Sequence, residues 1–202
     1  MVGLLAAALL VGCGPDKPPA SWSAALESPG AHPAPASHGA APTALRIPSI
    51  NLDSAKVSGK SWLPLGLESD GTMKVPDVHD PTRFGWYCPK GRPSCGAPFP
   101  GDVGGSVIVS HVNGGGHKGG FYDLRKVKIG DTIEVDTADG HTQVFRTSQA
   151  LVVRKQSFPI ATVWGESDHS RLSLITCGGE LDAVHHNYLD QVIVVSEYVT
   201  TR

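Results

Sequence analysis

The chain has 202 residues, of which 40% are hydrophobic and 18% are charged, and this composition is typical of one globular domain with a tail. The net charge of −2, without a basic block, excludes the usual electrostatic pattern of a nucleic-acid-binding protein. We therefore expect no nucleic acid among its partners.

Residues 1–13, MVGLLAAALLVGC, have the character of a bacterial lipoprotein-type signal, whose cysteine becomes lipidated. The apolar run is shorter than the ~20 residues of a spanning helix and fits a cleaved signal better. No basic residue precedes it, so a start further upstream would make it a longer membrane anchor. A buried helix is disfavoured because a Pro-rich segment follows directly. Both export interpretations predict a location on the extracytoplasmic face of the cell membrane.

Residues 14–43 are rich in Pro and Ala, with scattered Ser and Gly. Such a segment buries too little apolar surface to offset the entropy lost on ordering, so we expect an extended, disordered tether. The folded domain is then expected to span residues 44–202.

Six segments of this domain have the pattern of β-strands. They are rich in Val, Ile and Thr, and several alternate apolar with polar residues. Their ranges are 45–52, 105–112, 131–137, 142–153, 171–177 and 191–199. Asp139-Gly140 predicts a hairpin turn, because glycine readily takes a positive φ. Short helical turns are expected near 121–127 and 159–165. The sequence predicts a mostly β domain forming a closed or partly closed barrel.

The four cysteines divide by position. Cys13 belongs to the export signal, and Cys88 and Cys95 lie close together in WYCPKGRPSCG. A local disulfide suits an oxidising compartment. Zinc is the alternative, although the spacing departs from the usual pattern and no second ligand pair is evident. No other cysteine then remains to form a disulfide with Cys177, so it is either a buried, inert thiol or one kept for chemistry.

Two predicted strands end on groups that suit nucleophilic catalysis: GGSVIVSHV on His111 and RLSLITC on Cys177. A thiol is only slightly ionised at neutral pH, so cysteine catalysis usually recruits a histidine for proton transfer. Taken alone, a cysteine after an apolar run is a structural thiol about as often as a catalytic one. A histidine at the end of a strand is more often a hydrogen-bonded or surface residue than a catalyst.

Together and in this order, these motifs resemble the sortases, a family of extracytoplasmic cysteine transpeptidases built on an eight-stranded β-barrel. The resemblance runs from Leu45 to about Val195 and includes LRIPSINLDSAKV, LGLESDGTMKVPDVHDPTRFGWY, SVIVSHVNGG with FYDLRKVKIGDTIEV, and LSLITCGGELD. The GWY element, the threonine before the cysteine and the CGGELD continuation are most similar to class F sortases of actinobacteria.

The resemblance implies that Cys177 attacks the threonine carbonyl of an LPXTG-like sorting signal and forms a thioacyl-enzyme. His111 would protonate the leaving amine and then deprotonate an incoming amine, typically from a cell-wall precursor. Thr176 would contribute a hydroxyl or backbone group to the cleft. Hydrolysis would differ only in the second nucleophile. No cofactor or metal is expected.

One element of the family pattern is missing. Sortases place an arginine on the strand after the cysteine, but 186–190 holds His, Asn, Tyr, Leu and Asp. Loss of an oxyanion donor typically costs about a hundred- to a thousandfold in rate. The candidate replacements are His185, His186, Asn187, Gln191, Arg154 and Arg171. The paired histidines could instead be a solvated loop or, with Cys177, a zinc site that lacks a fourth ligand. A sortase-fold protein that binds peptide or cell-wall components without catalysis is therefore the alternative function.

Overall fold

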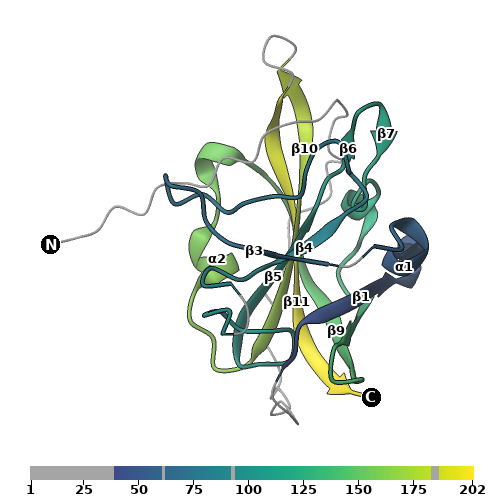
Figure 1. The fold of residues 1–202 in the computed structure, drawn as a ribbon, viewed down its shortest axis with the longest axis vertical. Helices are drawn as coiled ribbons and strands as arrows, with labels where there is room; N and C mark the ends of the chain where they lie inside the picture. Colours follow the sequence, from purple (N-terminus) through teal and green to yellow (C-terminus); the bar gives the residue numbers. More distant parts are fainter. Residues whose placement is uncertain (1–38, 61, 92–93, 183–186) are drawn as a thin grey trace, which may run out of the picture.

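A computed structural model describes residues 39–60, 62–91, 94–182 and 187–202 of the chain. The principal sheet has nine strands in the order β2-β1-β8-β9-β11-β10-β5-β4-β3 and curls into a half-barrel (Figure 1). The strands are β1 (Pro42–Ile47), β2 (Leu52–Asp53), β3 (Leu63–Leu65), β4 (Phe84–Tyr87), β5 (Gly104–Ser110), β8 (Thr132–Thr137), β9 (Thr142–Arg154), β10 (Ser170–Asp182) and β11 (Asn187–Thr201). A separate hairpin pairs β6 (Asn113–Gly114) with β7 (His117–Lys118).

The helices of the described residues are short. They are α1 (Ser54–Val57), α2 (Ile160–Trp164) and the 3-10 turns η1 (Pro48–Ile50), η2 (Leu124–Lys126) and η3 (Lys155–Ser157). The Asp53 carboxylate caps α1 by accepting from the amide of Ala55. Within the described ranges, none of these helices is long and apolar enough to span a membrane.

The predicted mostly β fold is confirmed, as are both helical turns and five of the six strand regions. The sixth region, 45–52, contains the end of β1, the turn η1 and the first residue of β2 instead of one strand. A turn containing Asp139 and Gly140 joins the antiparallel strands β8 and β9, and the φ of Gly140 is +88°. The described sheet has nine strands, where the resemblance implies eight, and the two-residue strand β2 lies at its edge and pairs with β1. Strand β1 begins at Pro42, so the last two residues of the expected tether lie in the sheet.

Alternation along the strands gives the sheet two apolar faces. On one face, the larger cluster includes Leu45, Phe84, Ile108, Phe121, Phe145, Leu172 and Leu174. We call the opposite side the site face; it includes Val107, Val109, Ile175, Cys177, Ile193 and Val195. Adjacent residues such as Leu174 and Ile175 therefore pack against different clusters. Helix α2 covers the site face through Val163, and Figure 1 shows it beside β5.

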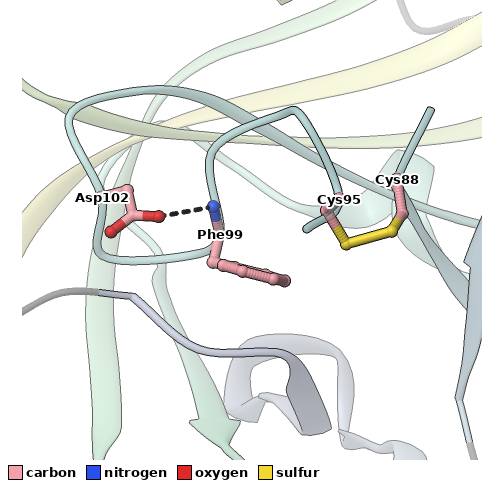
Figure 2. The surroundings of a disulfide bond; sticks show 4 residues. All are labelled: Cys88, Cys95, Phe99 and Asp102. Carbon is pink, nitrogen blue, oxygen red and sulfur yellow. Dashed lines mark hydrogen bonds between the residues drawn. A yellow bond between two sulfur atoms is a disulfide. The ribbon is translucent and has the colours of Figure 1, made fainter. Parts of the chain in front are cut away.

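Cys88 and Cys95 form a disulfide, with an S–S distance of 2.07 Å and a Cα–Cα distance of 4.4 Å. The predicted bridge is thereby confirmed over the zinc alternative. It closes the loop after β4, and the next turn is held by the Asp102 carboxylate, which accepts from the amide of Phe99 at 3.0 Å (Figure 2). Both half-cystines are buried in the larger cluster, so the loop is pinned to the domain.

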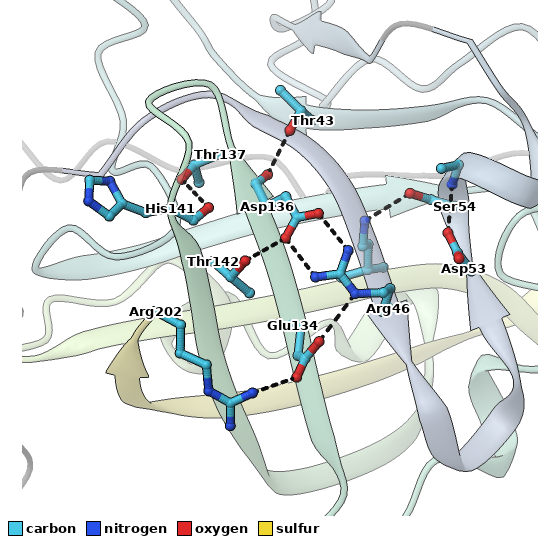
Figure 3. A network of polar contacts seen from close by, with 12 residues as sticks. Thr43, Arg46, Asp53, Ser54, Glu134, Asp136, Thr137, His141, Thr142 and Arg202 are labelled. Atoms are coloured by element: carbon cyan, nitrogen blue, oxygen red, sulfur yellow. Dashed lines mark hydrogen bonds and ion pairs between the residues drawn. The ribbon is translucent and has the colours of Figure 1, made fainter.

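A polar cluster of Arg46, Glu134, Asp136, Thr142 and Arg202 lies on β1, β8, β9 and the C-terminus, and we call it the β1–β8 cluster (Figure 3). Arg46 donates to both carboxylate oxygens of Asp136, at 2.5 and 2.6 Å, and to Glu134 at 3.2 Å. The Arg46 guanidinium lowers the pKa of Asp136 below its ordinary value, against the opposing effect of burial. Each charge in this cluster has a partner.

Candidate functional site

Cys177 lies on β10, and His111 directly follows β5, the parallel strand beside it. Strand β10 pairs with β5 from Ser170 opposite Gly104 to Ile175 opposite Val109. Two residues further along, Cys177 and His111 lie at the same level, and both line one small cavity. The thiol is 4% exposed and the histidine 5% exposed. The sheet thus brings together two groups separated by 66 positions in the sequence, 177 minus 111.

Strand β10 does not end at Cys177, as the sequence suggested, but continues to Asp182. The Gly178-Gly179 pair forms a bulge instead of a break, because the register with β11 shifts between Gly178 and Leu181. Gly179 has a φ of +75°, and a Cβ there would lie 2.0 Å from the carboxylate of Asp190. The backbone conformation therefore requires glycine at position 179, whereas a Cβ at Gly178 would lie 2.6 Å from the side chain of Val192.

The His111 ring is fixed by one backbone contact. Its Nε2 atom lies 2.7 Å from the carbonyl oxygen of Pro76, and a carbonyl can only accept, so Nε2 carries the hydrogen. Nδ1 is then the nitrogen able to exchange a proton without breaking this bond. Sequence reasoning missed Pro76, because a carbonyl contact in an irregular segment leaves no pattern in residue types.

The segment containing Pro76 covers the cavity, and we call residues 73–76 the strap. Val75 and Pro76 line the cavity with His111 and Cys177, leaving a volume of about 10 Å³ for the centre of a water molecule. That is room for about one water, not for a peptide. The segment is anchored beyond Pro76 by Asp80, whose pKa is lowered by hydrogen bonds from Lys60 and Arg83 against some desolvation.

The glycine-rich loop after His111 folds back beside it. Strands β6 and β7 form a hairpin, after which the amide of Phe121 donates to the His111 carbonyl at 2.9 Å. Gly119 permits this return, because a Cβ there would lie 2.0 Å from the same carbonyl oxygen. His117 is exposed on the hairpin and does not line the cavity. The loop thus supports the histidine backbone.

The two arginine candidates do not stand opposite Cys177. Arg154 ends β9 and alternation places it on the other face, where it pairs with Glu180 at 2.8 Å and Asp190 at 3.2 Å. The Glu180 contact raises its pKa. Arg171 lies six positions before Cys177, about 20 Å along the strand, and donates to the Gly165 carbonyl at 3.1 Å.

The other residues considered as replacements for the arginine also differ in where they lie relative to Cys177. His185 and His186 lie outside the described residues, which leaves their proposed roles as predictions. Asn187 pairs with Asp182 near the far end of the β10–β11 hairpin. Gln191 lies directly opposite Cys177 in the register and is fully buried. Thr176 lines the cavity, and its hydroxyl has no hydrogen-bond partner in the described part of the chain.

A second, larger cavity lies on the site face near the start of β5. Its volume is about 630 Å³, within the range of ligand sites, and its lining includes Leu67, Met73, Tyr87, Ile160 and Trp164. Burial raises the pKa of the Tyr87 hydroxyl. Tyr87, Ile160 and Trp164 pack against the cluster that contains Cys177. Met73 lines this cavity and Val75 the smaller one, so the strap borders both.

No group of three or more His, Cys, Asp or Glu side chains placed to hold a metal ion occurs among residues 39–60, 62–91, 94–182 and 187–202. Cys177 is the cysteine of the same ranges that forms no disulfide. The small cavity is therefore lined by a buried thiol and a buried imidazole, and the buried amide of Gln191 lies opposite the thiol on β11.

The fold and the site define a class of protein in which a cysteine and a histidine meet on neighbouring strands of a curled sheet. Comparison with protein families matches the sortase domain to residues 45–199. The chain belongs to the sortase family. Comparison with curated protein sequences gives no match.

Solved sortase structures share the fold. Sortase A from Corynebacterium diphtheriae superposes with a TM-score of 0.53 at 17% identity, over 81% of this chain and 63% of that one. Sortase C-3 from Streptococcus pneumoniae gives 0.53 at 19% identity, over 82% and 66%. A sortase C structure from the same organism gives 0.51 at 17%, over 77% and 64%. The chain thus spans less than two thirds of the length of these three structures.

Proposed function

We propose that this sortase-family chain is an extracytoplasmic cysteine transpeptidase of the class F type. It would cleave an LPXTG-like sorting signal and transfer the acyl group to an amine. The observation that carries the proposal is the parallel pairing of β5 with β10, which puts His111 and Cys177 at one level around one cavity. A thiolate beside an imidazolium is a matched nucleophile and acid.

The proposed reaction has two steps. The Cys177 sulfur attacks the threonine carbonyl, a C–S bond forms, and the C–N bond to the next residue breaks as His111 gives the leaving amine a proton. An incoming amine then attacks the thioester, gives its proton to His111, and the C–S bond breaks to release the Cys177 thiolate. Because Nε2 is held by Pro76, Nδ1 would carry the proton in both steps.

The larger cavity is an argument for a peptide substrate that contains apolar residues. It is lined by aromatic and aliphatic side chains on the site face, so it could accept the residues on the N-terminal side of the cleaved bond. The smaller cavity is too narrow for a peptide, and we expect the strap to move when substrate binds. The class F assignment rests on GWY at 85–87 and on TCGG at 176–179.

We also propose that residues 1–13 attach the chain to the membrane, by a lipid on Cys13 or as an anchor, with residues 14–43 as a tether. Fractionation of producing cells tests this. Cys13→Ala should release the chain from membranes if the cysteine is lipidated, whereas retention would favour the longer anchor.

The activity test uses the full chain, peptides with LPXTG-type signals and a small amine such as triglycine. We expect cleavage between threonine and glycine, a thioacyl adduct on Cys177 in the mass spectrum, and transfer to the amine; release of free acid alone would indicate hydrolysis. Cys177→Ala should abolish all three signals while leaving the melting temperature nearly unchanged. Absence of cleavage across many such peptides, with Cys177 reduced, would refute the proposal.

A second candidate is a sortase-fold protein that binds peptide or cell-wall components without catalysis. It is favoured by one observation: both candidate arginines, Arg154 and Arg171, are engaged elsewhere in the described structure. This candidate predicts that Cys177→Ala leaves ligand binding and the biological effect intact. Strict dependence of the effect on the thiol would exclude it.

A further inference from the structure

The side chain of Gln191 emerges beside the thiol of Cys177. Strands β10 and β11 are antiparallel, and Cys177 is the register partner of Gln191. Residues directly opposite in such a pair project to the same face, with their Cβ atoms about 4.5–5.5 Å apart. On the other side of β11, Gln191 pairs with Val153, which packs against the site-face cluster. The amide thus belongs to the layer of side chains around the thiol.

This amide is buried without hydrogen bonds. Gln191 is 0% exposed, and in the described structure neither its Nε2 nor its Oε1 has a partner. Nearly all buried polar groups in native proteins are paired, because an unmade bond costs the full desolvation of the group. An apolar residue would pack in this strand position without that cost. An amide with both ends free, next to a nucleophile, indicates a group that is paired when a ligand is present.

The chemistry of the amide indicates which ligand group it fits. A carboxamide offers a donor at Nε2 and an acceptor at Oε1, which complements a peptide group, itself an N–H donor and a C=O acceptor. A cationic side chain would offer donors only. Arg154, the nearest arginine in the strand order, projects from the other face and already pairs with two carboxylates.

We propose that Gln191 binds the main chain of the peptide at the bond that Cys177 attacks. Nε2 donates to the carbonyl oxygen, and Oε1 accepts from a peptide N–H of the same substrate. As negative charge develops on that oxygen, the donor is already in place, so the contact strengthens in the transition state. The identity of the peptide rests on the proposed function, whereas the pairing of the amide with a peptide group does not.

The test compares the full chain with Gln191→Met and Gln191→Glu. The first is close in size and removes both polar atoms; the second keeps an acceptor and replaces the N–H donor with a carboxyl oxygen, which cannot donate when the group is ionised. The control is Gln143→Met on β9, where Gln143 is equally buried, at 1% exposed, but lies opposite Thr201. That is ten residues from Val153, about 30 Å along the strand.

Two readouts are used with a peptide that contains Leu-Pro-Ala-Thr-Gly. The first is kcat/KM for its cleavage, and the second is its Kd for each variant combined with Cys177→Ala. We expect Gln191→Met and Gln191→Glu to lower kcat/KM by about 100- to 1000-fold and Gln191→Met to raise Kd at least tenfold. The melting temperature of Gln191→Met should equal or exceed that of the wild type, since an unpaired buried amide is removed. Gln143→Met should keep wild-type kcat/KM and Kd.

If the wild type cleaves the peptide, kcat/KM tests the inference. Values for the Gln191 variants within tenfold of the wild type would then overturn it. If the wild type does not cleave it, the proposed function fails with this peptide, and the Kd values test the inference instead. A Kd weakened at least tenfold by Gln191→Met then still supports the amide as a peptide-binding group. Equal affinity, or no binding by the Cys177→Ala chain, overturns it.

Discussion

Two regions of the sheet carry polar side chains, and they differ in how exposed these side chains are and whether they are paired. In the β1–β8 cluster, Arg46 and Asp136 are partly exposed and joined by two hydrogen bonds. Around Cys177, by contrast, an imidazole, a thiol and an amide are buried almost completely. The first region pairs its charges within the fold, whereas the described part of the second contains buried polar atoms without hydrogen bonds, namely the amide of Gln191 and the hydroxyl of Thr176.

This difference separates stability from function. Paired, solvated charges contribute modestly to the free energy of folding, and they need no ligand to complete their hydrogen bonds. Buried polar atoms without partners destabilise the free protein, and such features persist where activity requires them. Changes in the β1–β8 cluster should therefore alter stability but not chemistry, and changes around Cys177 should do the reverse.

The largest effect is expected from His111→Gln. Glutamine can still donate to the Pro76 carbonyl but cannot exchange a proton, so the fold should persist while proton transfer is lost. We expect kcat/KM for an LPXTG-type peptide to fall by about 10²–10⁴-fold, with little change in melting temperature. The matched control is His117→Gln on the exposed hairpin, which should behave as wild type. Activity of His111→Gln within tenfold of wild type would contradict the assigned role.

Local patterns in the sequence predicted the strands well, because alternation and β-branched residues report directly on a half-buried sheet. The hairpin at Asp139-Gly140 was equally readable, since its turn residues are adjacent in the chain. The proximity of Cys177 to His111 depends on a long-range parallel pairing, which residue types alone do not encode; it was expected only through the family resemblance.

Two further features lay beyond the sequence. The position of Gln191 opposite Cys177 depends on the register of β10 with β11, and the bulge after Gly178 shifts that register. The family resemblance places the arginine at 186–190, which ends one residue before Gln191. The strap carries no periodic pattern, so its cover over the site could be seen only in the folded chain.

Removal of the disulfide is expected to have an effect of intermediate size, and it tests whether stability and chemistry belong to separate regions. Cys88→Ala with Cys95→Ala removes the constraint on a loop with a sequence separation of 7, which corresponds to about 2.5 kcal/mol of unfolding free energy in the chain-entropy account. For a domain of this size the melting temperature should fall by about 5–10 °C. Both cysteines are replaced so that no single thiol is left to pair with Cys177.

The same variant should keep its chemistry. The loop ends beside the larger cavity, at Gly96 and Ala97, but does not line the cavity around Cys177. At 20 °C, well below the melting transition, we expect kcat to stay within about threefold of wild type while KM rises. A large loss of kcat with an unchanged melting temperature would show that the two regions are not separable in this way.

The smallest effect is expected from Arg46→Met, and it should depend on pH. Arg46 depresses the folded-state pKa of Asp136, so the pair stabilises the protein fully above the unfolded pKa of ~3.9 and loses that contribution as pH falls through the folded value. Both side chains are 32% exposed, which limits the effect at pH 7 to about 1 kcal/mol. Urea denaturation of wild type and variant should show this difference at pH 7 and convergence towards pH 2.5. The control, Lys128→Met on an exposed loop, should show neither. A difference that persists unchanged at pH 2.5 would mean that Arg46 acts through packing of its alkyl chain rather than through the carboxylate.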